Sequence, residues 1–259
     1  MSPARLLRVL GVGWWIHLKM LARSAFNGIL SVIWPLFFAT LAFLMYGLNG
    51  DQRTLLYASI GASVMGVWSA VSTSGSATVQ RERWQGTLEL LVAAPVPFAA
   101  VVLPITTAMA TVGLYSMAAT LLWGRLLFGI DVSIAHPLLF ALSVPVTVLA
   151  IGMLGFLMSV TVVRYRSAWA LGNAFELPVW LVSGFLVPLT VLPEWVRPIS
   201  WLLAPTWGVR AIRESALGGQ PLPDLLLCLG LGGAYCAIGV LCAESVLRSA
   251  RRHASLALS

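Results

Sequence analysis

Long apolar segments separated by short polar ones dominate the pattern of this chain. A membrane-spanning helix needs roughly 20 apolar residues, and six runs in the sequence are close to that length. They predict spans at residues 26–48, 54–79, 98–123, 138–163, 168–189 and 225–247. Pro35 lies inside the first run and predicts a kink there. The pattern therefore predicts an all-α membrane protein with six transmembrane helices, organised as one transmembrane domain over residues 1–259.

The first 25 residues have a different pattern. Apolar positions recur at steps of three and four, and the basic residues Arg5, Arg8 and Lys19 lie largely on the other side. This is typical of an amphipathic helix that lies in the membrane interface, where Trp14 and Trp15 suit headgroup depth. No short apolar core with a small-residue cleavage site precedes the first span, so we expect no cleaved signal peptide.

Residues 80–97 contain the densest charge cluster between two predicted spans. Its charged and turn-forming positions are Arg81, Glu82, Arg83, Gly86, Thr87 and Glu89. Thr87 is a suitable N-cap for a short helix, and Glu89 in the first turn matches the helix dipole. Pro95 and Pro97 end the segment. A short charged helix between two spans is a surface that a water-soluble partner can contact and move.

Residues 190–223 are too apolar for a free loop and too often interrupted by proline for a span. Tryptophan, proline and charged residues alternate there with aliphatic ones. Irregular backbone at membrane depth must be enclosed by protein, and tryptophan favours the interface. We expect one or two short re-entrant helices between the fifth and sixth spans, anchored by tryptophan.

The composition agrees with a bilayer environment. Hydrophobic residues make up 59% of the chain and charged residues 10%, with a mean hydropathy of +0.91; soluble domains carry about 25% charged residues. The net charge of +7 comes from basic residues at span ends, which indicates topology and contact with membrane lipid, not nucleic acid. The abundance of arginine, alanine and leucine suggests a GC-rich bacterial genome.

The basic residues also predict orientation. With six spans both termini share one side, which then carries eleven basic residues against five on the other. The five are Arg53, Arg125, Arg197, Arg210 and Arg213. The excess places both termini and residues 80–97 in the cytoplasm of a bacterial cell, with the protein in the inner membrane.

Candidate chemistry is sparse. The chain contains no GxxxxGK[ST] loop, GxSxG or HExxH, so it has no motif for ATP binding or for hydrolytic catalysis. Cys228, Cys236 and Cys242 lie in the last apolar run without a CxxC pair, which is typical of packing residues. We therefore expect no catalytic set, metal site or cofactor on this chain.

Two polar features at membrane depth have alternative explanations. Ser72, Thr73 and Ser76 in the second span either pack closely against another helix or line a polar path. Glu176 lies near the middle of the fifth span, where an acidic residue is costly and by default a functional hypothesis. It either faces a pathway, accepts a proton or pairs with a cationic substrate, or it forms a structural hydrogen bond before Pro178.

Two motifs resemble a known family. Arg81-Glu82-Arg83-x-Gln85-Gly86-Thr87-Leu88-Glu89-x-Leu91, closing at Pro95, is similar to the cytoplasmic coupling segment of type-2 ABC exporter permeases. The second motif resembles that family's fifth span and outer re-entrant region, and its parts are Leu177-Pro178, Ser183-Gly184-Phe185-Leu186-Val187-Pro188, Leu192-Pro193-Glu194-Trp195, Pro205-Thr206 and Arg210 to Gly218. The resemblance covers nearly the whole chain and is closest to the daunorubicin-resistance and nodulation-factor exporters. Trp84 departs from the acidic residue that this group often carries there.

The resemblance implies a transport function. It implies two permease copies, identical or related, and two separate ABC ATPase subunits that hold ATP and Mg. Residues 80–97 would couple to these subunits through Arg81, Glu82, Arg83 and Glu89, with Gly86 and Thr87 setting the bend. The translocation path would be lined by Ser72, Thr73, Ser76, Glu176 and Phe185. The outer gate would be formed by Pro188, Pro193, Trp195, Trp201 and Trp207. The expected cargo is amphipathic: a drug, a lipid-linked metabolite or a glycolipid.

Two alternatives belong to other classes. A polytopic intramembrane enzyme needs converging catalytic groups at membrane depth, and only Glu176 qualifies. A non-transporting membrane scaffold gives no reason for a capped, charged segment between two spans.

The predicted topology can be tested by chemical labelling. Single cysteines introduced at Gln80 and Gln220 should react with a membrane-impermeant reagent from opposite sides of the membrane. Labelling of both positions from the same side would exclude the six-span arrangement.

Overall fold

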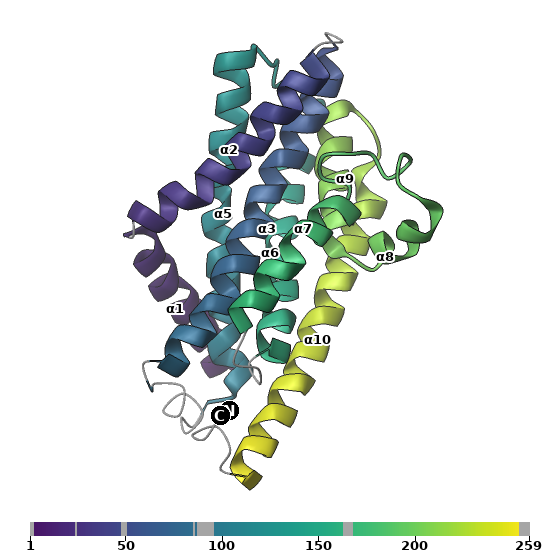
Figure 1. The fold of residues 1–259 in the computed structure, drawn as a ribbon. Helices are drawn as coiled ribbons and strands as arrows, with labels where there is room; N and C mark the ends of the chain where they lie inside the picture. Colours follow the sequence, from purple (N-terminus) through teal and green to yellow (C-terminus); the bar gives the residue numbers. More distant parts are fainter. Residues whose placement is uncertain are drawn as a thin grey trace.

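The computed structural model describes residues 3–23, 25–47, 51–84, 86, 96–162 and 168–253. All regular secondary structure in these residues is helical, so the prediction of an all-α protein is confirmed (Figure 1). The helices are α1 Pro3–Ala22, α2 Ala25–Gly47, α3 Gln52–Trp84, α5 Phe98–Phe128, α6 Pro137–Val162, α7 Ala168–Val182, η1 Glu194–Val196, α8 Arg197–Trp201, α9 Ala204–Leu217 and α10 Pro221–His253.

Several of these helices are suited to a bilayer. Within the described residues, four segments are long and apolar enough to cross a membrane: Gln52–Ser72, Phe98–Phe128, Pro137–Thr161 and Pro221–Ser245. A shorter apolar stretch, Pro35–Met45, lies in α2. The chain is therefore a multi-pass membrane protein.

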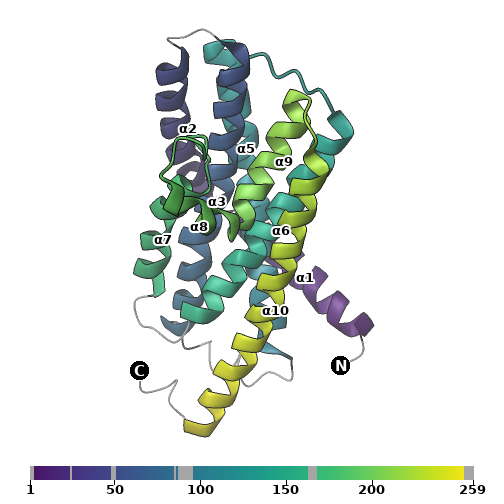
Figure 2. The same ribbon diagram turned by 90° about the vertical axis from the view of Figure 1, so that its right-hand side faces the viewer.

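Helix α3 occupies the centre of the bundle, between α2, α5 and α7 (Figures 1 and 2). Its apolar segment is 89% buried inside the protein, and Trp68 on it is fully buried. Small residues allow the neighbouring helices to approach closely. At Gly113 of α5, a Cβ atom would lie 2.6 Å from the Cα of Val67, so any side chain there would push α5 away from α3.

Helix α1 packs obliquely along α5 at one end of the bundle (Figure 1). The indole Nε1 of Trp14 donates a hydrogen bond to Oγ1 of Thr111 over 3.1 Å, and Gly13 lies against Pro104. Trp15 is half exposed, with the Lys19 ammonium 5.1 Å from its ring centroid. Trp14 therefore attaches α1 to α5, whereas Trp15 faces outward.

Two helix ends differ from the sequence-based bounds in a way that affects the candidate site. Helix α3 continues without a break to Trp84, five residues into the charged segment, and Gly86 follows with a φ of +70°, which an α-helix does not contain. Helix α7 ends at Val182, seven residues before the predicted position 189. Gly184 adopts a φ of +73°, a left-handed conformation that an α-helix does not contain.

The segment that follows α7 contains short helices. η1 and α8 are only 3 and 5 residues long, and α9 is a 14-residue helix. Proline lies at the start of α8 and of α9, where the absence of its N–H removes no hydrogen bond from the helix. Gly218 ends α9 with a φ of +91°, and its N–H donates to the Glu214 carbonyl. In Figure 2, α8 lies beside the end of α7, and α9 runs next to α6 and α10.

Candidate functional site

Carbonyl groups at the end of α7 have no helical partners, because the helix stops there. One of them is satisfied from α8, where the Ser200 hydroxyl donates to the carbonyl of Val182 over 2.6 Å. Ser200 is fully buried. The hydroxyl thus satisfies the last residue of α7 and holds α8 against it.

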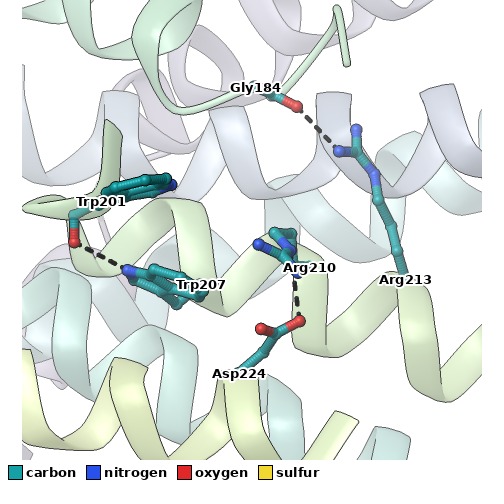
Figure 3. A network of polar contacts seen from close by, with 6 residues as sticks. All are labelled: Gly184, Trp201, Trp207, Arg210, Arg213 and Asp224. Carbon is teal, nitrogen blue, oxygen red and sulfur yellow. Dashed lines mark hydrogen bonds and ion pairs between the residues drawn. The ribbon is translucent and has the colours of Figure 1, made fainter. Parts of the chain in front are cut away.

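Arg213 on α9 satisfies further carbonyl groups just after α7. Only 3% of this residue is exposed. Its Nη1 donates to the Gly184 carbonyl over 2.8 Å (Figure 3), its Nη2 donates to the Phe185 carbonyl, and its Nε donates to the Tyr57 carbonyl of α3 over 3.1 Å. The guanidinium carbon also lies 3.5 Å from the centroid of the Tyr57 ring. One side chain therefore joins α3, α9 and the segment after α7; we call it the Arg213 anchor.

Gly61 makes room for this arrangement. A Cβ atom at this position of α3 would collide with the Phe185 carbonyl and with Nη2 of Arg213. The backbone after α7 therefore rests directly on the backbone of α3. Close backbone contact of this kind is a use of glycine that side-chain patterns do not predict.

A second polar network lies between α9 and α10 (Figure 3). Nε of Arg210 lies 3.3 Å from a carboxylate oxygen of Asp224, which is 6% exposed. The Arg210 guanidinium also lies 5.0 Å from the ring centroid of Trp207, whose indole donates to the Trp201 carbonyl over 2.9 Å. The network therefore links the start of α10 to α9 and the end of α8.

Tyr235 of α10 attaches the connection between α8 and α9 at a further point. Its hydroxyl donates to the Leu202 carbonyl and accepts from the Ala204 N–H over 3.1 Å. The short helices after α7 are therefore held by side chains from α9 and α10, and they form a fixed part of the bundle.

Helices α3 and α7 also share a polar contact at membrane depth. The Ser69 hydroxyl donates to a carboxylate oxygen of Glu176. Glu176 is half-buried, whereas its neighbours Phe175 and Leu177 are 50% and 57% exposed. Because Val179 and Trp180, three and four positions further on, are buried, Glu176 belongs to the more buried side of α7, which carries the α3 contact.

The other residues expected to line the translocation path lie in different surroundings. Ser72 is buried on α3, one turn from Ser69, and its hydroxyl donates to the Ser69 carbonyl over 3.4 Å. Phe185 is fully buried beneath the Arg213 anchor. Thr73 and Ser76 belong to α3, but their side chains lie outside the described part of the structure.

The predicted coupling residues lie around the end of α3. Arg81, Glu82 and Arg83 belong to its last turns, and their side chains are not among those described. Gly86 follows with its positive φ. Thr87 and Glu89 lie outside the described residues.

The predicted outer residues flank the short helices. Pro188 is half-buried and Pro193 is exposed. Trp195 and Trp201 are 72% and 55% exposed, while Trp207 is half-buried in the Arg210 network. Of these residues, Trp201 and Trp207 are joined directly by a hydrogen bond.

Sequence reasoning missed the polar contacts that hold the site together. In the sequence, Arg213 was one of five basic residues on one side of the membrane and part of the motif Arg210 to Gly218, and nothing distinguished Asp224 or Ser69 from other polar residues. One signal was available for Arg213, because it follows Ile212 and precedes Ala216 on the apolar side of an amphipathic helix. Among the described residues, no group of three or more His, Cys, Asp or Glu side chains converges on a metal site.

A bundle of long apolar helices with an internally satisfied broken helix defines a multi-pass membrane protein. Comparison with known protein families places residues 8–217 in the family described as ABC-2 type transporter, and the chain belongs to that family. Among curated proteins, it is similar to the linearmycin resistance permease protein LnrN of Bacillus subtilis (strain 168), with 24% identity over 172 residues. The match covers 66% of this chain and 44% of the relative, so the chain spans less than half of that protein's length.

The Arg213 anchor can be tested by substitution. Arg213→Gln should lower the free energy of unfolding by about 3 kcal/mol, because buried carbonyls lose their donors. Arg213→Lys should recover only part of this loss, since an ammonium lacks the planar fork that serves several carbonyls. Thermal unfolding in detergent, followed by tryptophan fluorescence, measures the change.

Arg197→Gln is the matched control. Arg197 lies on the neighbouring helix α8 in a partly exposed pair with Glu194 at 4.0 Å, and such pairs contribute at most about 1 kcal/mol. Equal unfolding temperatures for Arg213→Gln and Arg197→Gln would show that the anchor does not stabilise the bundle.

Proposed function

We propose that this chain is the membrane-spanning permease subunit of an ATP-driven exporter that moves an amphipathic substrate out of the cytoplasm. In this proposal two permease copies, identical or related, stand in the bacterial inner membrane with both termini in the cytoplasm. Two separate ATPase subunits bind ATP and Mg and carry out hydrolysis, and this chain itself catalyses no reaction. Membership of the ABC-2 type transporter family supports this assignment.

The proposal includes six spans. Besides the four long apolar segments, α2 has 23 residues and so a length of about 35 Å, enough to cross a bilayer core. Helix α7 has only 15 residues, about 22 Å. We propose that residues 183–193 complete this fifth crossing as irregular backbone, which is tolerated at membrane depth because Arg213 satisfies the carbonyls of Gly184 and Phe185.

The observation that carries the proposal is the continuity of α3. The helix has 33 residues and a length of about 50 Å, and about 35 Å of it lies between Tyr57 at the Arg213 anchor and the start of the charged segment at residue 80. A force on residues 80–97 from an ATPase subunit would therefore displace the whole helix. Its contacts would transmit that displacement, at Ser69 to Glu176 of α7 and at Tyr57 to Arg213 of α9. This connects ATP-driven motion to the proposed path and to the outer gate.

The surfaces beside the proposed path support an amphipathic substrate. One broad face of α7 exposes Phe175, Leu177 and Leu181. Glu176 lies on the opposite, more buried face together with Trp180. An exposed apolar face with a carboxyl group behind it suits an amphipathic molecule better than an inorganic ion. We propose that this face meets the second permease copy and encloses the path. The name of the B. subtilis relative describes a resistance permease, which supports a drug as one candidate cargo.

Co-purification tests the assembly. Tagged chain, solubilised in mild detergent and analysed by mass spectrometry together with the products of neighbouring genes, should retain a P-loop ATPase. Within that complex, Arg83→Ala should reduce substrate-stimulated ATP hydrolysis by about tenfold through loss of a charge-assisted contact, with expression unchanged.

Arg125→Ala serves as the control, because Arg125 is exposed near the end of α5 and so lies at the opposite end of the bundle. Its ATP hydrolysis should equal that of the wild type. Purification at normal membrane expression with no ATPase attached would refute the exporter proposal, and unaltered coupling in Arg83→Ala would refute the role of that residue.

Glu176→Gln separates function from packing at the α3–α7 contact. Glutamine keeps an oxygen that accepts from Ser69, so the unfolding temperature should stay near that of the wild type. Loss of the negative charge should reduce export of a cationic amphiphile by about tenfold, measured as ATP-dependent uptake into inside-out vesicles. Unchanged transport in a stable variant would assign Glu176 a structural role only.

A further inference from the structure

Two cavities adjoin at the end of the bundle where α3 begins, opposite to the start of α1 and the end of α10 (Figure 1). The first, of about 280 Å³, is here called the polar cavity. Its lining residues are Gln52, Arg53, Leu56, Asp131, Ser133, Ile134, Ala135, Ala216 and Leu217. The second, of about 290 Å³, is called the apolar cavity and is lined by Arg53, Thr54, Tyr57, Pro188 and Leu217. Arg53 and Leu217 line both.

The wall of the polar cavity is a fixed structure. Residues 129–136 form this wall between α5 and α6, and the Asp131 N–H donates to the side-chain oxygen of Gln52 over 3.2 Å. At its other end, the Ala135 N–H donates to the Ala216 carbonyl over 3.0 Å, and His136 does the same to Ser215 over 2.9 Å. Hydrogen bonds to the Gln52 side chain of α3 and to two backbone carbonyls of α9 therefore fix this wall.

The polar cavity contains one cation and one carboxylate that do not pair with each other. Both Arg53 and Asp131 are exposed, and the ion pairs formed among the described residues are Arg210–Asp224 and Arg197–Glu194. The nearby Asp51 is engaged in capping α3, since it accepts from the Thr54 hydroxyl and from the Arg53 N–H. Arg53 and Asp131 are therefore available to a ligand that carries both charges.

The two adjoining cavities match the two parts of a lipid. The polar cavity, of about 280 Å³, has room for a headgroup, and the apolar cavity has room for the carbon atoms next to it. The cavity lies at the start of the apolar segment Gln52–Ser72, the level at which lipid headgroups meet a spanning helix. The neighbouring Tyr57, Pro188 and Leu217 offer an apolar surface for the carbon atoms attached to such a headgroup.

We propose that the polar cavity binds the headgroup of a phospholipid with a phosphate and a primary ammonium, such as phosphatidylethanolamine. Arg53 would hold the phosphate through its guanidinium fork, and Asp131 would accept charge-assisted hydrogen bonds from the ammonium. The glycerol and the first acyl carbons would lie in the apolar cavity. A phosphatidylglycerol headgroup lacks the cation for Asp131, and a phosphatidylcholine headgroup has no N–H to donate.

The proposal is independent of the exporter function, because lipid binding requires neither ATP nor an ATPase subunit. The full chain is purified in detergent with equal amounts of phosphatidylethanolamine, phosphatidylglycerol and phosphatidylcholine of matched acyl chains. Native mass spectrometry then measures which lipid stays bound. The wild type should retain phosphatidylethanolamine about tenfold over the other two.

Single substitutions test whether the lipid preference arises at the polar cavity. Arg53→Gln should lower phosphatidylethanolamine retention to the level of phosphatidylcholine. Asp131→Asn should change the preference to phosphatidylglycerol, since Arg53 then remains as the cation. Arg125→Gln removes an exposed cation from the same end of the bundle outside the cavity, and it should retain the wild-type preference. Because all three side chains are exposed, the folded state should persist in each variant.

Two results would overturn the proposal. One is a wild-type protein that retains the three lipids equally or prefers phosphatidylglycerol. The other is a preference for phosphatidylethanolamine that survives both Arg53→Gln and Asp131→Asn, which would place the lipid elsewhere on the protein.

Discussion

Arg213 supplies the interaction on which the segment after α7 depends. A helix that ends inside a membrane protein leaves carbonyls that neither lipid nor an adjacent turn can satisfy. The guanidinium donates to two of them, at Gly184 and Phe185, and to Tyr57 of the central helix. Because these bonds are buried, the chain can stop α7 at Val182 and continue through short helices without leaving the fold.

Because α3 lies at the centre of the bundle, these local contacts connect distant parts of the protein. One helix carries the carbonyl bound by Arg213, the serine bound to Glu176 and the start of the charged segment. Close packing at Gly61 and Gly113 leaves no room for α3 to move without moving its neighbours. The features that sequence motifs identify separately are thus parts of one mechanical unit, which is the physical basis of the transport proposal for this member of the ABC-2 type transporter family.

Charged residues at the end of the bundle where α3 begins serve two different purposes. Arg210 and Asp224 pair with each other beside Trp207, and this pairing offsets the cost of burying the carboxylate. Arg53 and Asp131 line a cavity without pairing, where both side chains remain exposed. The first pair holds helices together, whereas the second presents opposite charges to a molecule outside the chain.

The sequence by itself determined the all-α membrane class, the approximate helix positions and the family resemblance, because apolar run length and local motifs are properties of neighbouring residues. The apolar run predicted a fifth span through residue 189, and the sequence did not show that α7 ends at Val182. Only the tertiary structure decided that Ser69 meets Glu176 and that Arg213 meets Tyr57, since these partners lie 107 and 156 residues apart. Such contacts depend on how closely the helices pack, and that closeness arises from glycines whose role appears only when two backbones meet.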